Sequence, residues 1–441
     1  MGIKRLLKHK KSAGAVAILL MATIAGAALN FGVQVLLARV LDVEAFGAFS
    51  SSLAMVTLVA PLAGFGVSGY WLKLYGHEGW AAQRWLPASF RFLLMSTSLV
   101  IVAVFVWAWL GPHDDLIAML LVLLSTVILG QLAVELSSVK YQLEGKYGGV
   151  ALWQFLPHFL RFAGVAALVL ALGQERFEVT YAASVFAIVA IILLVLGARQ
   201  MLKFTRADFV LEGHLGVFSD TRGRDVKSPT MIEVMSGSWP FGLAGIFYLI
   251  YFQSDIILVK YLVDDVAAGI YNVAFVVMAA VYLFPSVLYQ KFLLPKLHRW
   301  AYHDSGRLAR IYRVGNIVML ALGVLAMLML WLLAPPVLPW LFGGDYRDAV
   351  ALVMILAVAA PFRFLASSAG AMLVTRDYIR LKVKLMGGAA LVNIVLNLLM
   401  IPEYGAVGAA VATVVTEVFT AAVYIFYIRK KFFESYATEK N

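Results

Sequence analysis

The chain has 441 residues, of which 62% are hydrophobic and only 14% are charged. A soluble globular protein is nearer half apolar and a quarter charged, so the composition excludes an ordinary soluble domain. The sequence contains no cysteine, which excludes disulfides, thiolate metal sites and cysteine nucleophiles.

Apolar runs of about 20 residues, the length that crosses a bilayer as a helix, recur along the whole chain. The first run continues to about Arg39, too far for the apolar core of a signal peptide, so an uncleaved first span is expected. In chain order the runs predict an all-α polytopic membrane protein with twelve spans, at residues 13–38, 46–70, 87–110, 116–139, 149–172, 179–199, 238–260, 268–290, 314–342, 348–374, 383–401 and 405–428.

The basic residues predict the orientation of these spans. With both termini placed in the cytoplasm, the inner segments carry nearly all of the 36 Lys and Arg residues, as the positive-inside rule requires. The outer loops carry only Arg39, Arg176, Lys260 and Arg347. The same distribution accounts for the net charge of +11 without a nucleic-acid partner.

The chain is expected to divide into two lobes of six spans, residues 1–199 and 238–441, joined by a cytoplasmic linker at 200–237. LLARVLDVEAFGAF at 36–49 and ILVKYLVDDVAAGIY at 257–271 are weakly similar, and each joins the first and second spans of its half. Parallel repeats of this kind are known in transporters. Chance similarity between apolar segments is the alternative interpretation.

Charged residues inside spans cost roughly 2.5–3.5 kcal/mol at the bilayer centre, so they normally face a cavity or a partner. Arg161, Arg363 and Glu417 are predicted near mid-depth in spans five, ten and twelve, and Asp255 in the outer half of span seven. Arg161 and Glu417 could alternatively form a structural ion pair.

Other polar residues share helix faces with these charges or with one another, because spacings of three, four and seven residues fall on one side of a helix. The predicted stripes imply a hydrated interior. The alternatives are hydrogen bonding between helices for the two asparagines, an interior or proton-carrying role for the histidine, and packing for the tyrosines. The cavity-lining or coupling candidates are Gln154, His158, Asn30, Gln34, Tyr248, Tyr251, Asn393 and Asn397, together with Asp255 and Glu417.

The sequence contains no catalytic constellation. It has no H-E-x-x-H, no G-x-S-x-G and no G-x-x-x-x-G-K-[ST] phosphate-binding loop, and the last absence excludes ATP hydrolysis of that type. We therefore expect a protein that is not an enzyme, with no cofactor and no metal site.

Three segments resemble a known family: LLARVLDVEAFGAFSSSLAMVTLVAPLAGFGVSGY (36–70), SDIILVKYLVDDVAAGIYNVAF (254–275) and NIVLNLLMIPEYGAVGAAVATVVTE (393–417). Together they resemble the Wzx-type flippases for O-antigen and exopolysaccharide, which belong to the MOP (multidrug/oligosaccharidyl-lipid/polysaccharide) superfamily. The resemblance implies two six-helix lobes in a V, with a central cavity that opens alternately to each side of the bacterial inner membrane.

The resemblance also implies the cargo, an undecaprenyl-diphosphate-linked oligosaccharide moved to the periplasmic leaflet for surface polysaccharide synthesis. Membrane lipids and a polysaccharide polymerase or chain-length complex are the other expected partners. Because a guanidinium stays charged and binds phosphate oxygens in pairs, Arg161 and Arg363 are the expected diphosphate ligands. Glu417 would compete for an arginine when the site is empty.

A multidrug or small-solute antiporter of the same superfamily is the second interpretation. Drug-exporting relatives commonly carry a carboxylate on their first helix, whereas the first span here has Asn30 and Gln34 but no acid. A membrane glycan polymerase, ligase or glycosyltransferase is a third interpretation. Such enzymes usually need a sizeable outer loop, and every predicted outer loop here is short.

Overall fold

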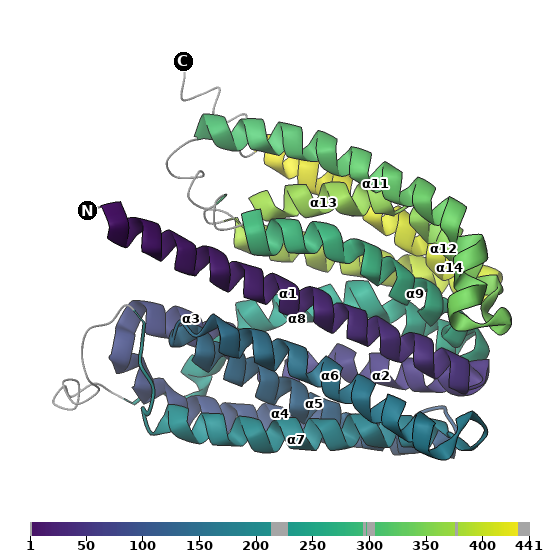
Figure 1. Cartoon of the computed structure of the whole chain (residues 1–441), viewed down its shortest axis with the longest axis horizontal. Helices are drawn as coiled ribbons and strands as arrows, with labels where there is room; N and C mark the ends of the chain where they lie inside the picture. The colour runs from purple at the N-terminus through teal and green to yellow at the C-terminus, as the bar shows by residue number, and fades with distance from the viewer. Residues whose placement is uncertain (1, 213–227, 294–296, 298–304, 375–377, 431–441) are drawn as a thin grey trace. The chain divides into compact units, whose positions relative to one another are not determined.

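The structure is a computed structural model that describes residues 2–212, 228–293, 297, 305–374 and 378–430 (Figure 1). Every regular element among these residues is a helix, and many of the helices are long and apolar enough to cross a membrane. The prediction of an all-α polytopic membrane protein is confirmed. Part of the predicted linker, residues 213–227, lies outside the described residues.

Contacts divide the chain into two compact units. The first unit comprises Met1–Val33 and Ser52–Ile246, and the second comprises Gln34–Ser51 and Phe247–Asn441. The first helix therefore begins in the first unit and ends in the second. The lobe boundaries predicted at 199 and 238 stay a prediction, because they follow chain order and not contacts.

The first unit is built from most of the helices before residue 247. Its element bounds are α1 (Gly2–Val40, to Val33), α2 (Val43–Gly64, from Ser52), α3 (Val67–Glu78), η1 (Gly79–Trp85), α4 (Leu86–Leu110), α5 (Asp115–Leu143), α6 (Tyr147–Leu172), η2 (Gln174–Arg176), α7 (Val179–Thr205) and the start of α8 (Met231–Leu262). Small residues let α5 and α7 approach closely: a Cβ on Gly130 would lie 2.8 Å from Ala190 Cα.

The second unit contains the rest of α8 and all later helices. These are α9 (Asp265–Ser286), a π-helical turn η4 (Val287–Leu293), α11 (Ser305–Phe342), η5 (Gly344–Tyr346), α12 (Asp348–Ala357), α13 (Ala360–Met372) and α14 (Ile379–Ile428). Asp264 caps α9 by accepting a hydrogen bond from the Ala267 amide.

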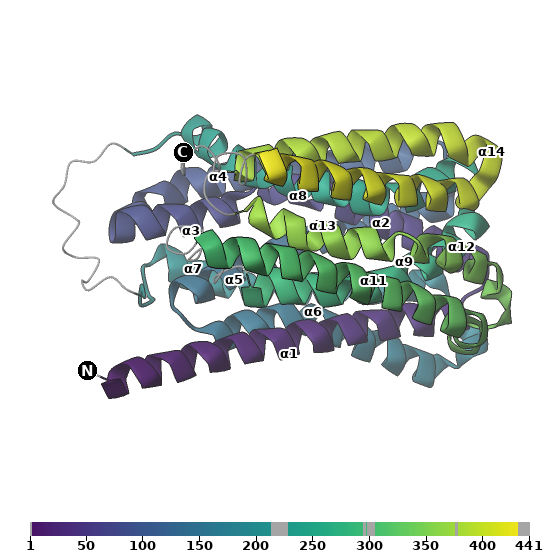
Figure 2. The ribbon, with the colours of Figure 1, turned by 90° about the horizontal axis from the view of Figure 1, so that it is seen from above.

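The second unit contains one bent pair of helices and one helix with an internal break. A bend of 45° separates α12 from α13. α14 is interrupted at Gly405, whose φ of 57° lies in the left-handed region that glycine adopts without strain. Figure 2 shows α14 turning back on itself, so that its two halves run in opposite directions.

The count of spans differs from the twelve predicted. Among the described residues, eight helical segments pass as spans by length and composition, or ten if each bent pair is one span. The difference arises because two continuous segments, Val43–Leu110 and Arg380–Ile428, each hold two of the predicted spans. The breaks within them are short: a turn at 65–66 and the 3₁₀ helix η1 in the first segment, and Gly405 in the second.

Residues 34–51, which join α1 to α2, pack within the second unit against α9. A Cβ on Gly269 would lie 2.6 Å from the Val43 carbonyl oxygen, so only glycine permits this approach. The Asn272 amide donates to Gln34 Oε1 (3.1 Å) and to Ser50 Oγ (2.9 Å). These contacts fix α9, one of the helices that form the site.

The far end of α11 is held by the same segment. Arg39 donates from Nε to the Leu341 carbonyl oxygen (2.7 Å) and from Nη2 to that of Trp340, which places a cation at a helix C-terminus. The Phe46 and Tyr346 rings meet edge to face at 5.8 Å. Burial and the nearby acids Asp42 and Asp345 raise the pKa of Tyr346, so its hydroxyl stays neutral.

Candidate functional site

An ion pair lies within the second unit, between α13 and α14. Arg363 Nη1 is 3.2 Å from Glu417 Oε1, and the Glu417 residue is 2% exposed. The break between α12 and α13 starts a new helix at Ala360. Arg363 is the fourth residue of this helix, and Pro361 occupies its first turn. A Cβ on Gly323 of α11 would lie 2.5 Å from Pro361 Cα, so close packing against α11 fixes the helix that carries Arg363.

Aromatic rings surround the Arg363 guanidinium. Its central carbon lies 5.5 Å from the Tyr251 ring centroid, 5.9 Å from that of Phe252 and 5.4 Å from that of Tyr282. Rings at this distance stabilise a cation through their negative faces. The Tyr251 hydroxyl and the second carboxylate oxygen of Glu417, Oε2, are both buried and have no hydrogen-bond partner among the described residues.

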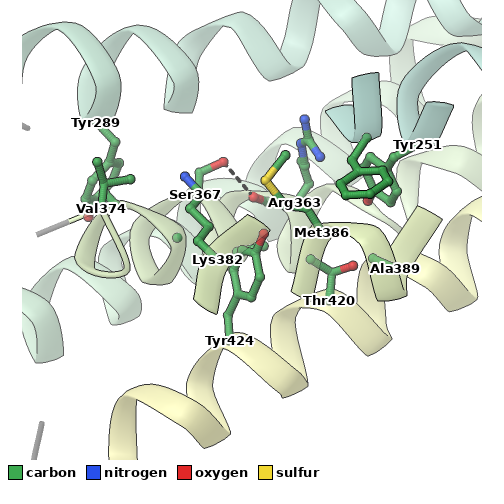
Figure 3. Close-up of a pocket in the computed structure, with 14 residues that line it drawn as sticks. Tyr251, Tyr289, Arg363, Ser367, Val374, Lys382, Met386, Ala389, Thr420 and Tyr424 are labelled. Atoms are coloured by element: carbon green, nitrogen blue, oxygen red, sulfur yellow. Dashed lines mark hydrogen bonds between the residues drawn. The ribbon is translucent and has the colours of Figure 1, made fainter. Parts of the chain in front are cut away.

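A pocket opens beside this ion pair. It offers about 120 Å³ to water-sized molecules, which is room for several waters or for a phosphate group. In the view of Figure 3, Tyr289 and Val374 lie at one end and Tyr251 and Ala389 at the other, with Arg363 and Lys382 between them. The lining residues are Phe247, Tyr251, Tyr289, Arg363, Ala366, Ser367, Gly370, Ala371, Val374, Lys382, Met386, Ala389, Thr420 and Tyr424.

A second buried polar cluster is centred on Asp255 of α8, which is 5% exposed. Its Oδ2 accepts from the Tyr271 hydroxyl (2.8 Å) and from the Thr413 hydroxyl, and its Oδ1 accepts from Asn397 Nδ2 (2.6 Å). Among the described residues no Lys, Arg or His lies within ion-pair distance of this carboxylate. Hydrogen bonds, and not an ion pair, therefore stabilise the Asp255 carboxylate.

The predicted asparagines belong to this cluster. Asn393 Oδ1 accepts from the Ser254 hydroxyl (3.0 Å), so both asparagines hydrogen-bond across to α8. The Asn397 Oδ1 atom is buried and has no hydrogen-bond partner in the described part of the chain. The cluster thus combines a carboxylate with several neutral oxygen atoms, a donor set that suits a proton or a hard cation.

Arg161 lies in the first unit, on α6. Its guanidinium carbon stacks 4.6 Å from the Phe186 ring centroid of α7, and within the described ranges no carboxylate pairs with it. Its buried Nε atom and the Nδ1 atom of His158, one turn earlier, also lack hydrogen-bond partners among the described residues. The His158 ring fits against α1, where a Cβ on Gly26 would lie 3.0 Å from ring carbon Cδ2.

The other predicted residues are less closely grouped. Gln154 is half-buried on α6 and Asn30 is exposed on α1, whereas Gln34 is buried and binds Asn272 within the second unit. Asn30 and Gln34, predicted to share one stripe, therefore belong to different units. The Tyr248 side chain lies outside the described residues.

Sequence reasoning missed Lys382, because it was counted among the basic residues of an inner loop. Its side chain lines the pocket with Arg363. The signal was present: Lys382, Met386, Ala389 and Asn393 follow one another at four-, three- and four-residue spacing, which places them on one face of α14. Tyr282, Tyr271 and Ser254 were also missed, since single hydroxyl-bearing residues in apolar runs carry no distinctive pattern.

The sequence matches the model of a known protein family. The model of the polysaccharide biosynthesis protein family matches residues 13–299, which is more than half of the chain. No curated protein sequence matches the chain significantly.

Solved structures share the fold across nearly the whole length. The lipid II flippase MurJ, in an inward closed conformation, superposes with a TM-score of 0.73 at 15% identity, covering 94% of this chain and 87% of that one. An inward-facing multidrug resistance MATE family transporter of the MOP superfamily gives 0.68 at 13% identity, covering 95% and 98%. A MOP superfamily transporter from Pyrococcus furiosus gives 0.66 at 14% identity, covering 95% of each chain. The chain therefore has the fold of the MOP superfamily transporters.

Proposed function

Because the chain belongs to the polysaccharide biosynthesis protein family, we propose that it is a flippase of the Wzx type. Its cargo would be an undecaprenyl-diphosphate-linked oligosaccharide, moved from the inner to the outer leaflet of the bacterial cytoplasmic membrane by alternating access. The likeness in fold to a lipid II flippase supports the proposal, since that protein is named for moving a lipid-linked cargo. Both termini would lie in the cytoplasm, and a polysaccharide polymerase complex would take the product.

The observation that carries the proposal is the composition of the pocket in the second unit. Its polar lining consists of two basic side chains, Arg363 and Lys382, and of tyrosine and hydroxyl groups, and the rest of its wall is apolar. Basic side chains at membrane depth are costly and are retained where an anion must be bound. Tyrosine rings and hydroxyls are well suited to the faces and hydroxyl groups of sugars.

The Arg363–Glu417 pair supplies a binding switch. With no cargo, Glu417 neutralises the arginine and so lowers the cost of holding it in the membrane. A phosphate group can replace the carboxylate, because a guanidinium binds either anion through paired hydrogen bonds. That Arg161 contributes to the same cargo site stays a prediction from the sequence.

Asp255 is the second part of the proposal, as the coupling group. Burial of an ionised carboxylate without a paired cation costs several kcal/mol in a protein. The cluster is therefore expected to take up a proton or a monovalent cation, and the oxygen atoms around Asp255 can serve either. Transport measured against sodium at fixed pH, and against pH without sodium, separates the two ions. In Asp255→Asn the dependence on the coupling ion should disappear.

A multidrug antiporter is the alternative, and the fold similarity to MATE transporters favours it. The basic lining of the pocket opposes it for cationic drugs, because two positive side chains would repel them. The first span also lacks the acid that drug exporters commonly carry, and has Asn30 and Gln34 but no carboxylate.

A transport assay with the purified protein tests the proposal. The full chain is reconstituted into vesicles with a fluorescent undecaprenyl-diphosphate oligosaccharide, and a membrane-impermeant reagent reports which leaflet holds the glycan. We expect protein-dependent movement of the glycan between leaflets without any change in its length or attachment. A changed glycan would indicate an enzyme, and export of cationic dyes in place of glycolipid would indicate the antiporter.

A further inference from the structure

Lys382 differs from Arg363 in one respect although both line the same pocket. Arg363 is held by Glu417 at 3.2 Å. Among the described residues, no carboxylate lies within ion-pair distance of the Lys382 amine. Glu417 therefore neutralises one of the two basic side chains of the pocket, and the charge of a protonated Lys382 has no carboxylate beside it within the described residues. Such a charge is the feature expected of a site that awaits an anion.

The Lys382 stem is fitted into the pocket wall. A Cβ on Gly370 of α13 would lie 3.0 Å from Tyr424 Cε2 and 3.8 Å from Lys382 Cε. The lysine stem therefore passes over Gly370 beside the Tyr424 ring. In the view of Figure 3, Lys382 and Ser367 are drawn between Tyr289 and Arg363. This placement differs from that of Lys384, two residues later, which is exposed.

The charges in and beside the pocket indicate which anion fits it. Two basic side chains line the pocket, and the adjoining carboxylate of Glu417 forms an ion pair with one of them, Arg363. A monophosphate group could bind Lys382 alone and leave the ion pair closed. A diphosphate carries a second phosphate that can displace Glu417 from Arg363. Only the diphosphate would engage both cations at once.

We propose that Arg363 and Lys382 form a two-cation site that selects a lipid-linked diphosphate over a lipid-linked monophosphate. Arg363 binds one phosphate through its guanidinium fork, and Lys382 binds the other as a point charge. Ser367 of the same helix also lines the pocket, and its hydroxyl donates to the Arg363 carbonyl oxygen at 2.9 Å. The inference rests on the proposed function, because it takes a polyprenyl diphosphate as the anionic part of the cargo.

Binding to the full-length purified protein tests this site. The probes are farnesyl diphosphate and farnesyl monophosphate, which share one lipid tail and differ only in the number of phosphates. Wild-type protein should bind the diphosphate at least about tenfold more tightly, as expected for one added charged hydrogen-bonding group. Lys382→Met keeps the apolar stem and removes the charge, and should bring the ratio close to one.

Two further variants control the experiment. Lys384→Ala removes a basic residue from the same turn of the same helix and should leave the ratio unchanged. Lys382→Arg restores the charge and should restore most of the preference, which a purely structural role for the stem would not require. Thermal unfolding of each variant reports whether the fold is retained.

The outcomes separate this inference from the proposed function. If the wild type binds both probes equally, or if Lys382→Met keeps the preference, the two-cation site is wrong while the flippase proposal stands. If the wild type binds neither probe, both are wrong. A loss of preference in Lys384→Ala equal to that in Lys382→Met would show a general surface-charge effect and would also overturn the site.

Discussion

The two arginines inside the predicted spans have opposite surroundings. In the second unit, Arg363 is paired with Glu417 and enclosed by the Tyr251 and Tyr282 rings. In the first unit, Arg161 stacks on Phe186 and has no paired carboxylate within the described residues. The same residue type therefore serves as a neutralised group in one unit and as an uncompensated charge in the other.

This difference shows how a membrane protein can hold a cation in two ways. Pairing with a carboxylate lowers the cost of burial but makes binding a competition between the ligand and the internal acid. Stacking on a ring leaves the guanidinium hydrogen-bonding groups available but stabilises the charge less. Removing each arginine should therefore have different effects on stability.

The largest effect is expected for Arg363→Ala. Breaking a buried pair from one side leaves the Glu417 charge uncompensated, which typically costs about 3–5 kcal/mol of stability. Glycolipid movement should also be lost, because the phosphate ligand is gone. Thermal unfolding in detergent and the vesicle assay measure the two effects.

The double variant Arg363→Ala/Glu417→Gln separates these two contributions. It should recover most of the lost stability, because no buried charge is left unpaired, and it should not recover transport. Recovery of transport in the double variant would show that Arg363 acts only as the partner of Glu417 and binds no cargo.

Arg161→Ala should abolish transport with a much smaller loss of stability. The interaction lost is the stacking on Phe186, worth about 0.5–2 kcal/mol. Phe186→Leu is the matched control, because it removes the ring and keeps the charge; it should lower stability by a similar amount while transport continues. Full transport in Arg161→Ala would contradict a phosphate-binding role for this residue.

Glu417→Gln tests whether the switch responds to pH. In the wild type, protonation of Glu417 releases Arg363, so binding of a polyprenyl diphosphate should strengthen as the pH falls. The glutamine cannot ionise, and the dependence should flatten at the level seen for the protonated wild type. Binding titrations at several pH values and constant salt measure this, and an unchanged profile would assign the dependence to another group, such as Asp255.

The smallest effects are expected for lysine at either arginine position. Arg161→Lys and Arg363→Lys keep the charge and lose the planar fork, so transport should fall partly and not completely. Initial rates in the vesicle assay are the measurement. Wild-type rates in both variants would indicate that charge alone, without bidentate geometry, serves the cargo.

Much of the fold could be predicted from the sequence because lipid imposes a strong constraint on it. Runs of about 20 apolar residues must form helices that satisfy their own backbone groups. The sequence did not show that α1 divides its residues between two contact units, with Asn30 in one and Gln34 in the other. Helix periodicity places residues on a face but does not say which neighbour that face meets.

The site was predictable only in part for the same reason. The cost of charge in lipid drew attention to Arg363, Glu417 and Asp255, and within the second unit the structure buries the two acids and leaves Arg363 half-buried. Their partners could not be assigned, since Glu417 was equally able to pair with Arg161. Lys382 was missed because a lysine near the end of a span normally reaches the aqueous phase, whereas here its stem crosses Gly370 into the pocket.

The exchange of Glu417 for a cargo phosphate at Arg363 is the central step of the proposed mechanism. Infrared difference spectroscopy of the full-length protein, with and without farnesyl diphosphate, observes the Glu417 carboxylate directly when wild type is compared with Glu417→Gln. If the exchange occurs, we expect a carboxyl band that changes when the diphosphate binds and is missing in the variant. A diphosphate that binds tightly while the Glu417 band does not change would contradict it.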